Sequence, residues 1–373
     1  MRDTRERRTT RRTVSMLATL ALVGALLFML SGVASAAPKK TCRVENTTLG
    51  KRYAPSAGAS LQRAIDEAVS GDTLEIQGRC VGVFTISDTT LTLIGVATRR
   101  DPVASLDGNG VDGTLVTVSS GSTVTFTDLV ITGANCTMSC LGGGISNLGT
   151  VTLNGSTQVS GNTSTGGGGI YNGPSGTIIL EDSASVSGNT AGSAGGGIVN
   201  RGTVILNDSS SVSQNTAGTV GGGIVNDSTG TVTMNDSSSV SENIAAVNGG
   251  GVFNLGSITL NDSSVVRANR AVGSGGSGGR GGGILTGADG TVTLNDSSSV
   301  SGNTATNDGG GLYNNDGIIT LNGSSSVSGN TAGLRGGGIF IVAGPVTMNG
   351  SSVVSGNTAP TCPDVYPCGS PDA

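Results

Sequence analysis

The residues that could do chemistry in this chain are mainly carboxylates, because the sequence contains no histidine. Regularly spaced carboxylates could bind Ca²⁺ through their oxygens. In a solvated turn the same side chains would only repel one another, by under about 1 kcal/mol per neighbouring pair. Both interpretations stay open, and we favour solvated turns. The carboxylates concerned recur at one position of a repeated pattern: Asp182, Asp208, Asp236, Asp262 and Asp296.

The missing histidine excludes several kinds of active site. Ser-His-Asp and Cys-His nucleophile systems and His-ligated zinc all need an imidazole. Glycosidases and polysaccharide lyases instead use clustered carboxylates, or calcium with a basic residue. A second acidic group, Asp107, Asp112 and Asp128, precedes the regular repeats and has no assignable role. We therefore predict no catalytic residue, cofactor or metal, and a protein that is not an enzyme is favoured without being settled.

Six cysteines lie outside the regular repeats, and they predict disulfides. An even number of cysteines in an exported chain indicates paired thiols. A metal site fits poorly, because the sequence has no CxxC pair and no histidine. The sequence leaves the connectivity open, and proximity along the chain favours the pairs Cys42–Cys80, Cys136–Cys140 and Cys362–Cys368.

These residues are carried by eight copies of one pattern between residues 142 and 359. Each copy reads roughly GGGI-x-N, then TVTLN, then SSSVSGN, with a mean period of about 28 residues. Such a period indicates a solenoid. Within each period apolar residues alternate with Thr and Ser in three short runs, which is typical of strands. The pattern predicts a parallel β-helix with three strands per rung, and asparagines after each run predict three hydrogen-bonded ladders at the corners.

Two segments resemble known families. The runs VSGNTAGLRGGGIF (327–340) and VSGNTSTGGGGIYN (159–172) resemble polymorphic outer membrane protein repeats, with Val for the aromatic residue and a third Gly for the Ala. The segment from Ser60 to Leu74 resembles the N-terminal cap of pectin-lyase-like β-helices. The resemblance implies an exported, right-handed β-helix, often an adhesin, here without the C-terminal membrane barrel. The predicted fold is therefore all-β: a right-handed single-stranded parallel β-helix of about 11 rungs with a short N-terminal capping helix.

We expect four parts along the chain. Residues 1–36 have a basic start, an apolar stretch and the small-x-small sequence Ala34-Ser35-Ala36, which predicts a cleaved signal peptide. Residues 37–135 form a cap and irregular rungs, including a helix over 60–69 that Ser60 can cap and that turns Leu61, Ala64, Ile65, Ala68 and Val69 to one face. Residues 136–359 hold the regular repeats, and 360–373 form a C-terminal cap or tail.

Charge and hydropathy limit the partners. Residues 1–36 contain six arginines, Asp3 and Glu6, so their removal leaves 14 basic and 23 acidic residues, a net charge of −9. With no basic patch, nucleic acid is not an expected partner. No later apolar stretch is long enough to span a bilayer. We expect an extracellular or cell-surface protein whose partner is a polysaccharide, a protein, or a second copy of itself.

One column of side chains provides the predicted contact site. Alternation places one residue per repeat outside the first strand, beside an aliphatic core position. An outward apolar stripe of this length would be unusual on a soluble monomer, and the alternative that long turns cover it stays open. The favoured function is non-catalytic surface contact or adhesion. A polysaccharide lyase or glycoside hydrolase is the alternative, and ice or ordered-surface binding through threonine rows is the third. The stripe comprises Tyr171, Val199, Val225, Phe253, Leu285, Tyr313 and Phe340.

Overall fold

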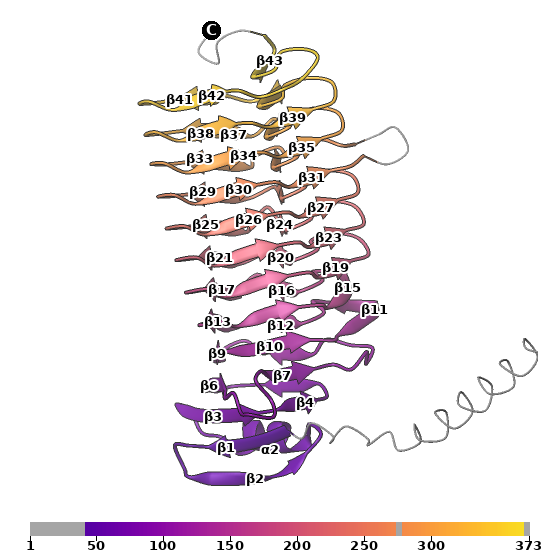
Figure 1. Ribbon diagram of the computed structural model, residues 1–373, viewed down its shortest axis with the longest axis vertical. Coiled ribbons are helices and arrows are strands. Elements are labelled where there is room, and N and C mark those ends of the chain that lie inside the picture. The colour runs from indigo at the N-terminus through magenta and orange to yellow at the C-terminus, as the bar shows by residue number, and fades with distance from the viewer. Residues whose placement is uncertain (1–41, 274–277, 369–373) are drawn as a thin grey trace, which may run out of the picture. The chain divides into compact units, whose positions relative to one another are not determined.

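A computed structural model describes residues 42–273 and 278–368 of the chain. The expected signal peptide at residues 1–36 lies outside the described residues, as do residues 369–373 of the expected tail. Within the described part, the chain winds into a parallel β-solenoid of about ten turns. Figure 1 shows the strands of successive coils stacked above one another.

Each regular coil is built from three short strands that bury alternate side chains. In one coil these are β16 (Ile170–Asn172), β17 (Thr177–Leu180) and β18 (Ser185–Ser187). Each pairs in parallel, residue for residue, with β20 (Ile198–Asn200), β21 (Thr203–Leu206) and β22 (Ser211–Ser213) of the next coil. Ile170, Ile178 and Val186 are fully buried inside the coil. The predicted period-two pattern therefore forms the core.

Three long sheets result from this stacking, which confirms the predicted three-sided, all-β fold. Sheet A carries the second strand of each coil and runs β2 (Lys51–Ser56), β1 (Cys42–Asn46), β3 (Asp72–Gln77), β6 (Thr90–Gly95), β9 (Thr123–Thr127), β13 (Thr150–Asn154), β17, β21, β25 (Thr231–Met234), β29 (Ser257–Leu260), β33 (Thr291–Leu294), β37 (Ile318–Leu321) and β41 (Val346–Met348). Sheet B carries the third strand and runs β4 (Arg79–Val81), β7 (Ala104–Asp107), β10 (Leu129–Thr132), β14 (Gln158–Ser160), β18, β22, β26 (Ser239–Ser241), β30 (Val265–Arg267), β34 (Ser299–Ser301), β38 (Ser326–Ser328) and β42 (Val353–Ser355). Sheet C carries the first strand and runs β5 (Phe84–Ile86), β8 (Val116–Val118), β12 (Ile145–Asn147), β16, β20, β24 (Ile224–Asn226), β28 (Val252–Asn254), β32 (Ile284–Thr286), β36 (Leu312–Asn315), β40 (Ile339–Ala343) and β43 (Val365–Tyr366).

A fourth, shorter sheet, which the sequence did not predict, accompanies these three. Sheet D follows the third corner of each coil, and most of its strands are only two residues long. Such short strands carry too little alternation to be recognised from a pattern. The sheet runs β11 (Asn135–Leu141), β15 (Thr163–Gly166), β19 (Thr190–Ala191), β23 (Thr216–Ala217), β27 (Ile244–Ala245), β31 (Arg270–Ala271), β35 (Thr304–Ala305) and β39 (Thr331–Ala332).

The N-terminal end is closed by a helix and an unpredicted hairpin. The predicted capping helix is present as α2 (Ala59–Glu67), and Leu61, Ala64 and Ile65 are buried as expected. Ser60 does not cap it: Gly58 is the N-cap, and the backbone N–H of Ser60 donates to Ser56 Oγ at 2.7 Å. Ala68 is the C-cap residue, and the predicted burial of Val69 is wrong, because that side chain lies beyond the helix and is exposed. Strands β1 and β2 form an antiparallel pair that extends sheet A beyond β3 at the N-terminal end.

Asparagine ladders run along the coil axis, as the sequence predicted. In the buried ladder, each Nδ2 donates to the Oδ1 of the asparagine in the next coil at 2.9–3.1 Å, from Asn162 to Asn357. Asp364 Oδ1 accepts the last of these bonds at 3.0 Å. The half-buried ladder at the second corner runs the opposite way, with Asn235 donating to Asn207 at 2.8 Å. A third ladder extends from Asn147 to Asn254.

Candidate contact surfaces

The predicted exposed stripe is not exposed, and this corrects the site expected from the sequence. Its side chains do point away from the coil interior, since they belong to clusters separate from the main core. All except Phe253 are nevertheless buried, with at most 9% of each side chain exposed. Phe253 is half-buried and packs against both of the outer clusters. The stripe residues Tyr171, Val199, Val225, Phe253, Leu285, Tyr313 and Phe340 therefore form a second apolar core outside sheet C.

The glycine triplets explain why this column is covered. The first glycine of each triplet has a positive φ, such as +66° at Gly195 and +64° at Gly221. A β-carbon at either position would lie 2.5 Å from the Cγ2 atom of Val199 or Val225, so only glycine fits there. The chain before each triplet is thereby laid across the outward face of sheet C. Alternation indicates which way a side chain points, but not what lies beyond it.

The covering residues form a row of their own, immediately before the triplets. Ala194 and Val220 pack on the first half of the column. Isolated parallel bridges join this row from coil to coil, including Val220 with Asn248 and Asn248 with Arg280. Sequence reasoning did not identify this row. The apolar column itself could have revealed this row, because a soluble protein rarely leaves an apolar stripe of that length exposed.

At the C-terminal end the column becomes an aromatic stack beneath arginines. The rings of Tyr313 and Phe340 lie 5.1 Å apart, and those of Phe340 and Tyr366 lie 4.8 Å apart. The guanidinium of Arg335 lies 4.6 Å from the centre of the Phe340 ring and makes two 2.9 Å hydrogen bonds to Asp308. Its hydrogen bond to Asp308 raises the pKa of Arg335, and burial raises the pKa of Tyr313. This arrangement fixes the last coils rather than presenting an open binding surface.

The outward face of sheet A is open and uncharged. We call two columns of outward side chains on strands β6 to β41 the threonine face; a third outward column, which includes Asn154 and the half-buried asparagine ladder, runs beside it. Strand pairing along the face is in register from one coil to the next, so its side chains form two straight columns. None of these side chains is buried. The columns are Thr90, Thr123, Thr150, Thr177, Thr203, Thr231, Ser257, Thr291, Ile318, and Thr92, Thr125, Thr152, Ile179, Ile205, Thr233, Thr259, Thr293, Thr320, Thr347.

The hydroxyl groups of the threonine face remain available to an outside partner. Across the described residues, the side chains of this face make one hydrogen bond to each other, from Thr291 Oγ1 to Ser257 Oγ at 3.1 Å. The corresponding face of sheet B is different, because it is mainly serine and carries the Arg79–Asp107 ion pair and the exposed Arg267. Sheet A thus provides the more uniform of the two open faces.

The aspartate column has a structural role at a turn. Asp182 and its equivalents at 208, 236, 262 and 296 share a φ of +54°, which Asp and Gly tolerate better than most residues. Asp208 Oδ2 accepts the backbone N–H of Asp182 at 3.0 Å, and the same contact recurs up the column. Each carboxylate thus satisfies a backbone N–H of the preceding coil. This contact is a structural reason for an aspartate at this position of the repeat.

The other acidic group separates into three different contacts. Asp107 pairs with Arg79 at 2.5 Å. Burial opposes the charged form of Asp107, but the hydrogen bonds from Arg79 and from the backbone of Asn109 hold its pKa below the ordinary value. Asp112 accepts the backbone N–H of Thr137, and Asp128 accepts the N–H and hydroxyl of Ser156.

The three predicted disulfides are all present. Their Cα–Cα distances are 4.5 Å for Cys42–Cys80, 5.9 Å for Cys136–Cys140 and 5.3 Å for Cys362–Cys368, within the usual range for disulfides. The first ties β1 to β4 at the N-terminal cap, and the last closes the loop that carries β43. The middle one lies where the irregular coils meet the regular repeats.

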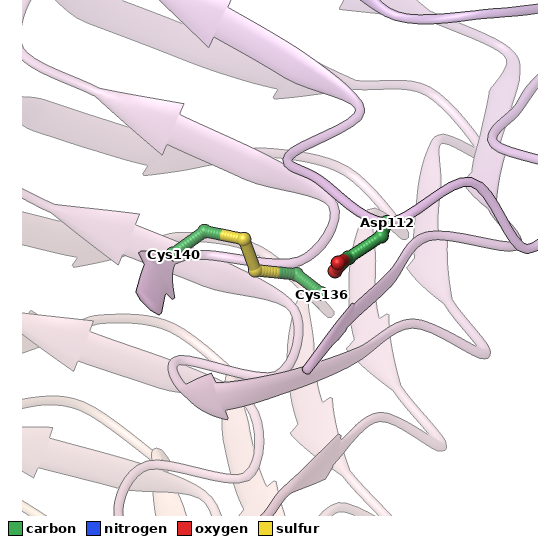
Figure 2. A group of neighbouring side chains, drawn as sticks. All are labelled: Asp112, Cys136 and Cys140. Carbon is green, nitrogen blue, oxygen red and sulfur yellow. A yellow bond between two sulfur atoms is a disulfide. The ribbon is translucent and has the colours of Figure 1, made fainter. Parts of the chain in front are cut away.

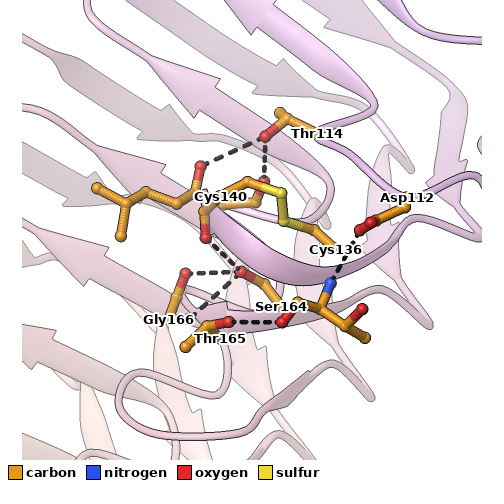
Figure 3. Close-up of a disulfide and its surroundings, with 10 residues drawn as sticks. Asp112, Thr114, Cys136, Cys140, Ser164, Thr165 and Gly166 are labelled. Atoms are coloured by element: carbon orange, nitrogen blue, oxygen red, sulfur yellow. Dashed lines mark hydrogen bonds between the residues drawn. A yellow bond between two sulfur atoms is a disulfide. The ribbon is translucent and has the colours of Figure 1, made fainter.

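One group of potential metal ligands lies among the residues that the structure describes: Asp112, Cys136 and Cys140, within 4.8 Å of one another (Figure 2). Because the two sulfurs are bonded to each other, neither can serve as a thiolate ligand. The neighbourhood is held by ordinary hydrogen bonds (Figure 3). Thr114 Oγ1 donates to the Gly142 carbonyl at 2.8 Å, and Ser164 Oγ donates to the Cys140 carbonyl at 3.3 Å. We interpret this group as a structural contact between the irregular coils and the regular repeats.

A hollow in the N-terminal cap contains two carboxylates. Glu45 on β1 lies opposite Glu75 on β3, and both line the hollow with Arg43, Arg52 and Tyr53. Glu45 is neutralised by an ion pair with Arg52 at 2.9 Å.

Comparison with known proteins adds no assignment: the chain matches no family model, no curated protein and no solved structure. No helix in the described part of the chain has the length and hydropathy needed to cross a bilayer.

Proposed function

We propose that the protein is an exported, non-catalytic β-solenoid that makes contact with an extended surface through its threonine face. The observation that carries this proposal is the pair of uncharged columns, in register over nine and ten strands of sheet A. Many identical weak contacts suit a regular, extended partner better than a single small ligand, which needs a concave pocket. The former candidate, the apolar stripe, is buried and no longer offers a surface.

Three further features support export and a contact role. The signal-like residues 1–36 precede a described chain with three disulfides, which persist in oxidising compartments. The resemblance to polymorphic outer membrane protein repeats and to pectin-lyase-like caps favours an adhesin-like protein outside the cell. The net charge of −9 expected after cleavage disfavours nucleic acid as a partner. A cell-surface polysaccharide or protein, or a second copy of the chain, remains within the proposal.

The test compares binding to solid surfaces with and without an intact threonine face. The mature protein would be mixed with insoluble neutral and acidic polysaccharides, whole cells and polycrystalline ice, and bound protein measured. We expect binding to at least one surface and its loss in a Thr231→Lys/Thr233→Lys variant. Binding to none, or binding that the variant retains, would contradict the proposal. Release of new reducing or unsaturated sugar ends would favour the enzymatic alternative.

A further inference from the structure

The geometry of the threonine face points to ordered water as its partner, and we propose that the protein binds ice. This inference rests on the contact role proposed above and names the partner of the same face. Of the nineteen side chains in the two columns, fifteen are threonine, three are isoleucine and one is serine. The face therefore presents methyl groups at eighteen of the nineteen positions and hydroxyl groups at sixteen.

The spacing of the columns matches ordered water along the solenoid axis. Strands of neighbouring coils lie about 4.8 Å apart, so equivalent hydroxyls repeat at that interval. Water molecules joined by hydrogen bonds of about 2.75 Å in a tetrahedral network have second neighbours about 4.5 Å apart. The spacing between coils and the second-neighbour distance of water therefore differ by less than about 10%. A water molecule bound at one hydroxyl is therefore placed close to the lattice position relative to the next.

The threonine side chain restricts the positions of these hydroxyl groups before any partner binds. Threonine is branched at Cβ, which restricts χ1, whereas serine rotates more freely. In each column, residues of neighbouring coils also stand side by side, since Thr203 is the strand partner of Thr231 and Ile205 of Thr233. A surface that is already ordered pays less conformational entropy on binding. Sheet B has the same coil spacing but mostly serine, so it provides an internal comparison.

The absence of charge from the face favours ice over a polysaccharide. The chain carries an excess of acidic residues, yet no outward position in the two columns is charged. None of these nineteen positions is aromatic, amide or carboxylate either, so the two columns lack rings to stack on sugars and groups that make paired hydrogen bonds. The asparagine ladder runs beside the columns, and from Asn207 to Asn349 its amides are hydrogen-bonded to one another. Regularly spaced methyl groups can order the surrounding water, and regularly spaced hydroxyl groups can form hydrogen bonds to that water. Neither group is specific for a sugar.

The test measures whether the mature, disulfide-bonded protein enters growing ice. Protein partitioned into a slowly frozen ice fraction would be compared with a non-binding protein of similar size, and the shape of single ice crystals recorded. We expect enrichment in the ice fraction and faceted crystals. The Thr231→Lys/Thr233→Lys variant should lose at least about tenfold in partitioning, equivalent to one power of ten in affinity.

The matched control places two lysines on sheet B of neighbouring coils, as Ser211→Lys/Ser239→Lys. This variant has the same added charge and should keep ice partitioning within about twofold. Circular dichroism and melting temperature would establish that all three proteins share one fold. Exclusion of the wild-type protein from ice would overturn the inference, and so would equal loss in the two variants.

The same variants separate this inference from the wider proposal. If ice excludes the wild-type protein but an insoluble polysaccharide binds it through Thr231 and Thr233, the ice inference is wrong and the contact function stands. If no solid surface depends on these two residues, both are wrong.

Discussion

The outward columns of sheet C and sheet A share one strand geometry and have opposite surroundings. Val225 on β24 and Thr233 on β25 lie in the same coil, and both side chains point away from its interior. Val225 is 8% exposed because the segment that precedes the glycine triplet covers it, whereas Thr233 is only half-buried within the described part of the chain. The comparison shows that in a solenoid the strands determine which way each side chain points, and the turns determine which outward face is exposed to solvent.

The largest expected effect comes from opening the covered column. Phe340→Ala should destabilise the C-terminal coils by about 3–5 kcal/mol, since it removes a buried ring that contacts Tyr313, Tyr366 and Arg335. The matched change on the open face, Thr347→Ala, should cost under about 0.5 kcal/mol. Urea denaturation followed by circular dichroism would measure both. Similar small losses in the two variants would mean that the column is not a core.

The next effect distinguishes the buried ladder from the half-buried one. The Asn243 side chain makes four hydrogen bonds, to Asn215, Val212 and Asn269, whereas Asn235 makes two. Because an unsatisfied buried group costs about 1–3 kcal/mol, Asn243→Ala should lower stability by about 3 kcal/mol or more, and Asn235→Ala by about 1 kcal/mol. Calorimetry of the two variants would test this order. A larger loss at Asn235 would reverse our account of the corners.

A smaller effect of the opposite sign is expected inside the coil. Ser238 is fully buried, and its hydroxyl has no hydrogen-bond partner within the described part of the chain. Ala184 occupies the equivalent position two coils earlier. Ser238→Ala should therefore raise stability by about 1 kcal/mol, because an unpaired buried hydroxyl is removed. A drop in the melting temperature would indicate a partner for this hydroxyl, such as buried water.

The smallest effect concerns pH and the N-terminal cap. Hydrogen bonds from Lys51 and Arg63 lower the pKa of Glu67 to about 2, from 4.5. A lowered carboxyl pKa stabilises the fold fully above pH 4.5, and this contribution is lost as the pH falls through about 2. The urea midpoint of wild type should exceed that of Glu67→Gln slightly at neutral pH, and the two should converge near pH 2. An unchanged difference across that range would mean that these contacts do not stabilise the cap.

Much of this architecture could be predicted from the sequence, because its determinants are local and repeated. Alternation at Val151 and Leu153 gives the core, and stacked asparagines give the ladders. The three cysteine pairs follow from proximity along the chain. The burial of the stripe could not be predicted in the same way. It depends on a segment that folds back from the neighbouring turn, and a period-two pattern does not record such a contact.

Other differences have similar causes. The β1–β2 hairpin lies outside the repeats, so the repeat pattern did not predict it. Ser60 has the residue type of a helix cap, yet the helix begins one residue earlier, and packing in the cap buries Ser60 beside Cys42. The aspartate column was correctly placed at a turn, but its bond to the backbone of the preceding coil requires the stacked geometry.

The measurement that tests the central claim most directly is the stability of two lysine variants within one coil. Val225→Lys would place a charge beneath the covering segment, and Thr233→Lys would place the same charge on the open face. Since an unpaired buried charge is strongly destabilising, we predict a loss of about 3 kcal/mol or more for Val225→Lys. For Thr233→Lys we predict a change within about 0.5 kcal/mol. If urea denaturation shows equal stability for the two variants, the two faces do not differ as the structure indicates, and the account is wrong.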